Sequence, residues 1–388
     1  MENKNEWRKI KLGEITTITM GQSPKSEFYN LTGEGMPFLQ GNRTFGKKFP
    51  FFDTYTTKIT KTAQKNDTIM SVRAPVGDLN LATTDICLGR GVCSLRMNNG
   101  NYEFLFYLLK YYSKQLSNNG NGTVFSSINR NEIYNLEINI PTNEIVQRKI
   151  AKILSDIDKK MELNNKINNN LEEQAELIFN NYFLENSSSN ILKEDKLFIL
   201  SKEIICGKTP STKNKEFYGT NIPFITIPDM HNKVYIDSTE RLLSFIGADS
   251  QKNKYLPINT ICVSCIGTAG LVSLTSKLSQ TNQQINSIIP KTKELTYYIY
   301  FLMRNLKDKI NLIGASGSTF CNLNKKDFSN ILVPIPKDDI LKQFYYICLP
   351  IFENIKNNQI ENEKLNNLKN YLLPKLMNGE IDVEKIEL

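Results

Sequence analysis

Hydrophobic side chains recur every three or four residues along a segment that follows Pro141. The segment contains no glycine and no proline, so it is expected to form one long helix. Its alternating four- and three-residue steps predict a seam that packs against another helix. The positions of this seam are Ile150, Leu154, Ile157, Met161, Asn164, Asn168, Leu171, Ala175, Ile178 and Tyr182.

A second segment near the C-terminus repeats this seam 194 residues later, with two asparagines at the same seam positions. A buried asparagine pair lowers stability but fixes the register of two packed helices. We therefore expect the two helices to pack on each other rather than to be unrelated amphipathic helices. Pro350 is expected to kink or break the second one. The second seam consists of Phe344, Cys348, Ile351, Ile355, Asn358, Asn362, Leu365, Lys369, Leu372 and Leu376.

Before and between these helices, short runs of β-branched and aromatic residues alternate with glycine and proline turns. Such runs predict strands, and two apolar periodic segments, at about residues 102–117 and 295–310, predict helices. The sequence therefore predicts an α+β fold with two globular domains, each followed by a long helix. Strands are expected at Thr68–Val72, Val92–Arg96, Ile258–Ser264 and Ile331–Ile335.

The two globular parts are copies of one another. The stretch "TITMGQSPKSEFYNLTGEGMPFL" at residues 17–39 aligns with "EIICGKTPSTKNKEFYGTNIPFI" at residues 203–225, and later segments continue the match at offsets of 193 to 195. A repeat of this length is too long for a solenoid unit and indicates a duplicated domain plus linker. We expect a first domain at 1–141, a central helix at 142–186, a second domain at 187–336 and a C-terminal helix and tail at 337–388.

Charge is distributed unevenly along the chain, which has a net charge of +8. Residues 1–140 carry 17 basic and 12 acidic side chains and residues 191–337 carry 19 and 11, whereas both helical segments are net acidic. Two basic blocks favour a polyanionic partner for the globular domains. No apolar run is long enough to cross a bilayer, so we expect a cytoplasmic protein without membrane contact.

Residue patterns for catalysis or metal binding are weak. The "GKT" of residues 207–209 resembles the end of a phosphate-binding loop, but Lys202 stands where an earlier glycine is required and Pro210 follows directly. The only histidine, His231, cannot serve a site repeated in both halves, and the closely spaced cysteines at 262 and 265 lack further zinc ligands. We expect no catalytic residue, no bound metal and no cofactor in this chain.

A DNA duplex is the polyanion that the polar loops of the two domains favour. Lysine and arginine suit phosphates, whereas arginine, asparagine and glutamine recognise base edges through paired hydrogen bonds. The loops differ most between the two copies, so the two domains are expected to read different sequences; ordinary solvation is the competing interpretation for any single side chain. Candidate DNA contacts are Gln40, Asn42, Arg43, Lys47, Lys48, Arg73 and Arg90 in the first domain, and Lys208, Lys213, Lys215, Lys233, Gln283 and Gln284 in the second.

Over nearly its whole length, the chain resembles the specificity (S) subunit of Type I restriction–modification enzymes. The resemblance rests on the order and duplication of several stretches. They are "WRKIKLGEI", "GQSP", "PFLQGN", "SVRAPVGDLNLA", "LGRGVCSL", "INIPTNEIVQRKIAKILSDID", "NLEEQAELIFNNYF" and "YLLPKLMNGEID".

The resemblance implies two target-recognition domains held apart by two long antiparallel helices. Each domain would read one half of a split DNA target, and the helices would dock two methyltransferase (M) subunits, joined by restriction (R) subunits. S-adenosylmethionine, ATP and magnesium would then belong to those partners. A helix of about 40 residues spans about 60 Å, which is long enough to set the gap between two half-sites about 34 Å apart or a multiple of that.

Two points stay open in the sequence. The start of the second long helix, "KDDILKQFYYICLPIF", lacks the Gln-Arg-Lys-Ile pattern of residues 147–150, so its docking surface is expected to differ. A coiled-coil scaffold that binds only proteins is the alternative function. Such a scaffold would show no salt-dependent affinity for DNA.

Overall fold

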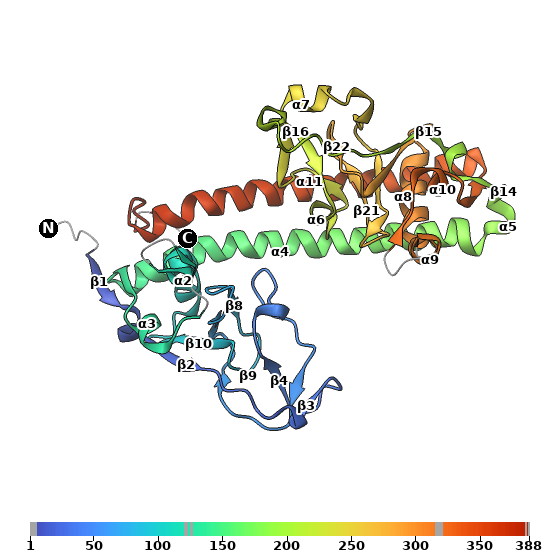
Figure 1. Cartoon of the computed structure of the whole chain (residues 1–388). Coiled ribbons are helices and arrows are strands. Elements are labelled where there is room, and N and C mark those ends of the chain that lie inside the picture. The colour runs from blue at the N-terminus through green and yellow to red at the C-terminus, as the bar shows by residue number, and fades with distance from the viewer. Residues whose placement is uncertain (1–5, 120–122, 125–126, 315–320, 385, 387–388) are drawn as a thin grey trace. The chain divides into compact units, whose positions relative to one another are not determined.

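The computed structural model describes residues 6–119, 123–124, 127–314, 321–384 and 386. The chain forms two compact units, one from Met1–Lys160 together with Leu365–Leu388 and the other from Met161–Lys364. Two long helices, α4 (Glu144–Asn180) and α11 (Asp338–Met377), each contribute one section to either unit (Figure 1). Each unit therefore contains one mixed globular domain and its own section of a helix pair.

The first unit is built around a four-stranded antiparallel sheet. Its strands are β2 (Thr16–Met20), β7 (Thr68–Ser71), β8 (Leu79–Leu81) and β10 (Val92–Met97). The strand order is β2-β10-β7-β8. Helix α2 (Tyr102–Ser117) packs on this sheet and buries Phe104, Leu105 and Leu108 in the same core as Met70 and Leu95. These elements confirm the predicted strands at 68–72 and 92–96 and the predicted helix at 102–117.

A second sheet of the first unit carries the polar loops. Its strands are β3 (Tyr29–Asn30), β4 (Met36–Leu39), β5 (Tyr55–Thr56), β6 (Thr62–Ala63) and β9 (Ile86–Leu88), in the order β3-β5-β4-β9-β6. Strands β4 and β9 run parallel, with Leu39 opposite Leu88. Both leucines are buried in one core cluster with Ile69 and Val92 of the first sheet, so the two sheets share a core.

Short elements complete the first unit. Strand β1 (Trp7–Lys11) pairs antiparallel with β13 (Glu137–Pro141), which precedes α4. The remaining elements are α1 (Leu12–Ile15), η1 (Ser26–Phe28), η2 (Asn42–Thr44), β11 (Asn118–Asn119), β12 (Thr123–Val124) and α3 (Arg130–Tyr134).

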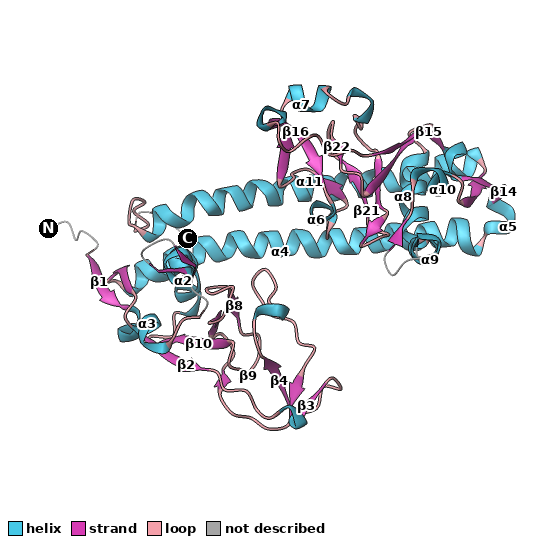
Figure 2. Ribbon diagram, viewed as in Figure 1, coloured by secondary structure: helices cyan, strands magenta, loops and turns pink. Residues whose placement is uncertain are grey.

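The second unit repeats the strand order of the first. Figure 2 shows the helices and strands of both units. The main sheet of the second unit contains β15 (Ser201–Cys206), β17 (Tyr235–Ile236), β19 (Ile261–Ser264), β21 (Val272–Thr275) and β23 (Ile285–Pro290). The order β15-β23-β19-β21-β17 places β15, β23, β19 and β21 where the first unit has β2, β10, β7 and β8. Strand β16 (Tyr218–Ile225) runs parallel to β22 (Gln280–Thr281), as β4 does to β9. The common topology shows that the predicted repeat is a repeat of fold.

The other elements of the second unit follow the same correspondence. Strand β14 (Ile191–Lys196) pairs antiparallel with β25 (Leu332–Pro336), as β1 does with β13. The remaining elements are η3 (Asn181–Glu185), α5 (Ser187–Asn190), η4 (Leu197–Leu200), η5 (Lys215–Phe217), α6 (Ile227–Met230), β18 (Arg241–Leu243), α7 (Phe245–Asp249), η6 (Lys252–Lys254), β20 (Ile266–Gly267), α8 (Leu295–Asn305), α9 (Lys307–Gly314), β24 (Cys321–Asn322) and α10 (Lys325–Ser329).

The segment predicted as one helix at 295–310 forms two helices, α8 and α9, that meet at Leu306. This residue has φ −87° and ψ 6°, and its N–H donates to the carbonyl oxygen of Leu302 at 3.0 Å as a helix C-cap. The chain leaves the helical conformation here and restarts at once. No glycine or proline marks the break, so the sequence carries no signal for it.

The two long helices pair antiparallel within each unit. In the second unit, Asn164 Nδ2 donates to Asn362 Oδ1 and Asn358 Nδ2 donates to Asn168 Oδ1, each at 2.9 Å. Because higher residue numbers on α4 pair with lower residue numbers on α11, the two helices run antiparallel. In the first unit, Lys369 of α11 meets α4 in the same sense. The predicted pairing through shared asparagine positions is confirmed.

The seam departs from its predicted positions near one end of each helix. Ile150, Leu154, Ala175 and Ile355 are buried as expected, but Ile178 and Ile351 are only partly buried. The core positions are occupied instead by residues one position further along the helices, namely Phe179, Phe183 and Phe352. Here the helices face an aromatic core as well as each other, which widens the apolar face beyond a coiled-coil seam. The other predicted seam residues Ile157, Met161, Leu171, Leu365 and Leu372 are half-buried, while Asn358 and Asn362 carry the contacts given above.

Pro350 does not break α11, which continues as one helix from Asp338 to Met377. The proline itself is exposed, whereas Cys348 and Phe352 on either side of it are fully buried. Packing on both sides holds the helix together although Pro350 lacks an N–H to donate. Of the expected kink or break, the break was therefore wrong, and the kink stays a prediction.

Glycine is required at two equivalent turns. A Cβ atom at Gly21, in "GQSP", would overlap the backbone oxygen of Gly89, and one at Gly207, in "GKTP", would overlap that of Asn282. Each turn thus lies equally close to the backbone of a neighbouring turn. Because the same close approach is found at "GQSP" and "GKTP", the "GKT" residues belong to a repeated structural turn and not to a phosphate-binding loop.

The close approach predicts that Gly21→Ala and Gly207→Ala each lower the free energy of unfolding by about 1–3 kcal/mol, because the facing backbone must shift. Urea unfolding of the full chain, followed by circular dichroism, measures the loss. Gly41→Ala is the matched control, since no atom of a described residue beyond its two chain neighbours lies within 4 Å of the added methyl group, and the backbone is extended, with φ −164°. Equal losses in all three variants would contradict this explanation.

Candidate nucleic-acid interface

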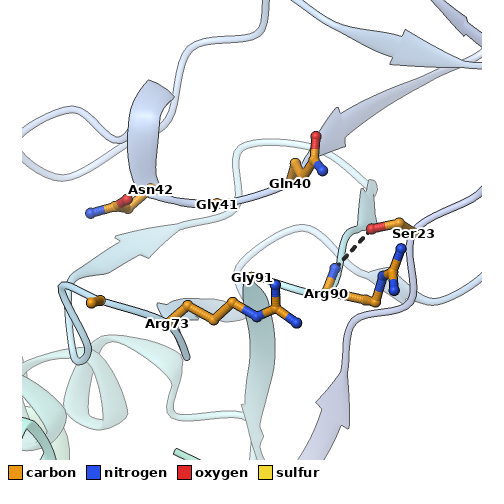
Figure 3. Close-up of a pocket in the computed structure, with 8 residues that line it drawn as sticks. Ser23, Gln40, Gly41, Asn42, Arg73, Arg90 and Gly91 are labelled. Carbon is orange, nitrogen blue, oxygen red and sulfur yellow. Dashed lines mark hydrogen bonds between the residues drawn. The ribbon is translucent and has the colours of Figure 1, made fainter. Parts of the chain in front are cut away.

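Three polar loops of the first unit converge on one hollow of about 290 Å³ (Figure 3). The loops are the segment after β4, the loop after β7 and the turn between β9 and β10. The "GQSP" turn adds Ser23. The hollow is lined by Ser23, Gln40, Gly41, Asn42, Arg73, Ala74, Arg90 and Gly91. Four of the predicted DNA contacts, from three separate sequence positions, therefore meet at one place.

Backbone hydrogen bonds position these loops. Gly89 donates to the carbonyl oxygen of Leu39 at 2.7 Å, and Gly91 donates to that of Gln40 at 3.0 Å. Val72 donates in turn to the Gly91 carbonyl oxygen at 2.9 Å. Backbone hydrogen bonds therefore position the loops that carry Gln40, Arg73 and Arg90 without using the side chains of these three residues.

Two arginines dominate the charge of the hollow. Arg73 and Arg90 are both exposed, and neither guanidinium forms an ion pair with a residue that the structure describes. Figure 3 shows the Arg73 side chain extending from its loop toward Arg90. Two unpaired guanidinium groups beside the amides of Gln40 and Asn42 form a surface suited to phosphate and base edges.

The other two candidates beside the hollow already have acidic partners. Arg43 pairs with the Asp53 carboxylate at 2.7 Å, and this hydrogen bond lowers the pKa of Asp53. Asn42 Nδ2 donates to Asp78 Oδ2 at 2.6 Å. Both contacts are exposed, so an incoming phosphate competes with them in water.

Lys47 is exposed, but Lys48 points inward, with only 9% of its surface exposed. Its Nζ lies 4.0 Å from Asp158 Oδ2 of α4 and 5.9 Å from the centre of the Tyr107 ring. A buried ammonium in these contacts is not available to a phosphate. Lys48 is therefore not expected to contact DNA. Its contacts with Asp158 and Tyr107 hold its loop against α4 instead.

Asp158 is the centre of a buried polar cluster that sequence reasoning missed. Its carboxylate accepts hydrogen bonds from Tyr107 and from Lys369 Nζ, each at 2.6 Å. Burial lowers the pKa of the neighbouring Lys110, and the positive charge of Lys369 lowers it further. The available sequence signal was Lys369, a charged residue in a seam otherwise made of apolar residues and two asparagines. The cluster joins the loop that carries Lys48 to both long helices.

The candidate DNA contacts of the second unit also include both exposed side chains and one that is bonded within its own loop. Lys208, Lys213 and Lys215 are exposed, whereas Lys233 Nζ donates to the carbonyl oxygen of Ser238 at 3.1 Å and lies 3.6 Å from Asp237. Lys233 is thus held within its own loop.

The two glutamines of this unit lie on the turn between β22 and β23. Gln283 is exposed, and its Oε1 accepts a hydrogen bond from Thr209 Oγ1 at 2.7 Å. Gln284 is half-buried, and its Oε1 accepts one from Asn282 Nδ2 at 3.0 Å. The loop that contains Lys208 lies against the same turn, since Lys208 N–H donates to the Thr281 carbonyl oxygen.

The features considered for other chemistry do not form such sites. No helix begins at Thr209, which lies outside any helix or strand between β15 and η5. Cys262 and Cys265 are buried in two different core clusters, and burial raises the pKa of Cys262 to about 12. Among the residues that the structure describes, no group of three or more potential ligands could hold a metal, and no helix is long and apolar enough to cross a membrane.

The duplicated domains match a known family. The model of the Type I restriction modification DNA specificity domain matches the chain twice, at residues 4–173 and 202–370. The chain belongs to the specificity subunits of Type I restriction–modification systems. It is 31% identical to the specificity subunit of the Type I restriction enzyme HindI from Haemophilus influenzae, covering 97% of this chain and 100% of that protein.

A further relative and a solved structure are also similar to the chain. The specificity subunit of the Type I restriction enzyme MjaIX from Methanocaldococcus jannaschii is 26% identical, covering 98% of this chain and 95% of that protein. The crystal structure of a Type I S subunit from M. genitalium shares the fold, with a TM-score of 0.62 at 19% identity and 97% coverage of each chain. The predicted resemblance and the α+β fold are confirmed. As a specificity subunit, the chain recognises DNA and is not the catalytic component.

The structure gives the Gln-Arg-Lys-Ile pattern of this specificity subunit a local role. Gln147 Nε2 donates to the Pro141 carbonyl oxygen at 2.9 Å, and Ile150 is buried. Lys149 Nζ donates to three carbonyl oxygens of the C-terminal tail, those of residues 383, 384 and 386. Three of the four side chains therefore hold the first unit together, and only Arg148 is exposed.

The buried cluster predicts a large effect of Asp158→Ala, because it leaves the buried Lys48 and the partly buried Lys369 without their carboxylate. The free energy of unfolding should fall by about 3–5 kcal/mol, measured by urea unfolding. Asp156→Ala is the matched control on the same helix, where an exposed carboxylate pairs with Lys152, and its cost should stay below about 1 kcal/mol. Similar costs for both variants would show that the cluster does not anchor the loop.

Proposed function

We propose that this specificity subunit reads a split, asymmetric duplex DNA target, with one half-site for each globular domain. The domains are those expected at 1–141 and 187–336. The observation that carries the proposal is the hollow of the first unit, where Arg73 and Arg90, which form no ion pair with a described residue, meet the amides of Gln40 and Asn42. The second unit has the same fold with different loop side chains, which favours a second and different half-site.

The chemistry of these side chains suits both parts of DNA recognition. Exposed lysines such as Lys47 and Lys208 provide positive charge for phosphates, which positions the domain without reading sequence. Arginine, glutamine and asparagine can form paired hydrogen bonds with purines in the major groove. We propose that the exposed candidates make these contacts, and that Lys48 and Lys233 support the loops instead.

The long helices are the proposed docking site for partner subunits. Leu163 and Ile167 of α4 are 52% and 40% exposed and lie four residues apart, so they share one face of the helix. An exposed apolar pair of this kind favours a protein partner. We propose that two methyltransferase subunits dock here, with restriction subunits joining them. S-adenosylmethionine, ATP and magnesium would be bound by those partners, in the cytoplasm.

Co-expression with the methyltransferase subunit, followed by mapping of methylated adenines in the host DNA, tests the proposal. We expect methylation confined to one split motif with two unequal halves. Purified subunit should also lose DNA affinity steeply as salt rises, because phosphate contacts release counterions. Scattered methylation, or affinity that does not change with salt, would favour a protein-binding scaffold.

Helix length offers a separate test of the spacer role. We propose that α4 and α11 set the gap between the half-sites. Inserting seven residues into both helices, after Lys160 and before Leu365, adds about 10 Å while the seam keeps its face. The gap in the methylated motif should grow by about three base pairs, at 3.4 Å each, with unchanged half-sites. Altered half-site bases with an unchanged gap would refute this role.

A further inference from the structure

Two turns occupy equivalent places in the two units. The first joins β9 to β10 and contains Arg90. The second joins β22 to β23 and contains Gln283. Each turn follows a strand that runs parallel to the strand before the first polar loop, with Leu39 opposite Leu88 in one unit and Ile225 opposite Thr281 in the other.

The register of the next strand defines which residues correspond. Val92 lies opposite Ser71 across β10 and β7, and Ile285 lies opposite Ser264 across β23 and β19. Both pairs differ by 193 residue numbers, as do Leu88 and Thr281. Arg90 therefore corresponds to Gln283.

Backbone hydrogen bonds give the two turns the same shape. Gly89 donates to the Leu39 carbonyl oxygen at 2.7 Å, and Asn282 donates to that of Ile225 at 3.1 Å. Within each turn a further bond spans three residues, from Val92 to Gly89 and from Ile285 to Asn282. The turn is thus a constant frame, and its exposed side chain is the variable part.

A hydroxyl group from the "GQSP" or "GKTP" segment forms a hydrogen bond with a residue of the facing turn in each unit. In the first unit, Arg90 N–H donates to Ser23 Oγ at 3.1 Å. In the second, Thr209 Oγ1 donates to Gln283 Oε1 at 2.7 Å. Ser23 of "GQSP" and Thr209 of "GKTP" are equivalent in the repeat. These equivalent hydroxyl groups therefore hold the backbone of Arg90 and the side chain of Gln283.

We propose that Arg90 and Gln283 are the corresponding base-reading residues of the two domains, Arg90 for a guanine and Gln283 for an adenine. An arginine fork donates to O6 and N7 of guanine, whereas a glutamine amide accepts from N6 and donates to N7 of adenine. The inference rests on the proposed function and adds to it the chemical identity of one base in each half-site.

The surroundings of both side chains leave these hydrogen bonds free to form. Arg90 is exposed and makes no ion pair with a described residue. Gln283 is exposed, and the bond from Thr209 uses only one lone pair of its Oε1. The second lone pair and both amide hydrogens remain for the base. The Thr209 hydroxyl also holds the amide in one orientation before DNA binds, which lowers the entropy cost of recognition.

Exchange of the two side chains tests the assignment. Arg90→Gln and Gln283→Arg are each co-expressed with the methyltransferase subunit, and methylated adenines are mapped beside the wild type. Arg90→Gln should replace one guanine by adenine in one half-site only. Gln283→Arg should replace one adenine by guanine in the other half-site only. A bidentate contact is worth about 1–3 kcal/mol of discrimination, so preference at that position should change roughly 5- to 150-fold.

Loss of charge alone is controlled by Lys65→Gln and Lys326→Gln, which remove one exposed lysine from each unit outside these turns. Both controls should keep the wild-type motif. An unchanged motif in the exchanged variants would overturn the assignment, as would uniformly weaker methylation or changes confined to one half-site. A wild type with a split motif and such variants would leave the proposed function standing, whereas a wild type without any motif would remove both.

Discussion

The antiparallel pairing of α4 with α11 is the constraint on which each unit depends, because each takes a section of both helices into its own core. Polar pairs mark the register, Asn164 with Asn362 in the second unit and Asp158 with Lys369 in the first. Such pairs are costly: Asn164 Oδ1 is buried without a hydrogen bond from any described residue, a cost of about 1–3 kcal/mol. A shifted register would bury these groups opposite apolar side chains, so the pairs favour one alignment over all others.

Helix α4 contacts the globular domain of each unit through a buried tyrosine at the same position of the repeat. Helices α2 and α8 begin 193 residues apart, and Tyr107 and Tyr300 occupy the same position in them. Tyr107 donates to Asp158 at 2.6 Å and Tyr300 donates to Glu172 at 2.5 Å. Burial holds the pKa of Tyr300 well above its usual range, so the phenol stays a donor. The duplication kept the tyrosine but not its partner, since Asp158 follows the first domain in the chain whereas Glu172 precedes the second, and the residue 194 positions after Asp158 is Phe352.

Much of the fold could be predicted because it depends on periodicity and repetition. The seam, the asparagine positions and the strands at 68–72 and 92–96 follow from the order of apolar and polar residues. Features that depend on tertiary contact could not be predicted. The inward orientation of Lys48 requires a carboxylate from a helix more than 100 residues away, and Pro350 is tolerated because distant core residues hold the helix on both sides. The convergence of Gln40, Arg73 and Arg90 likewise follows from strand pairing that no local pattern reveals.

The turn backbone supports the fold, whereas the exposed side chains of the turns are the proposed DNA contacts. This division of roles affects how such a protein can change its DNA target. Exposed side chains that make no internal contact contribute little to stability, within about 0.5 kcal/mol, so residues such as Arg90 can be exchanged without loss of the fold. The glycines beneath them cannot, because the backbone of the facing turn occupies the space that a Cβ would need. Sequence divergence is therefore expected to concentrate at the exposed turn residues while Gly21 and Gly207 stay constant. Two copies of one scaffold can then acquire different base preferences without any change in how either copy folds.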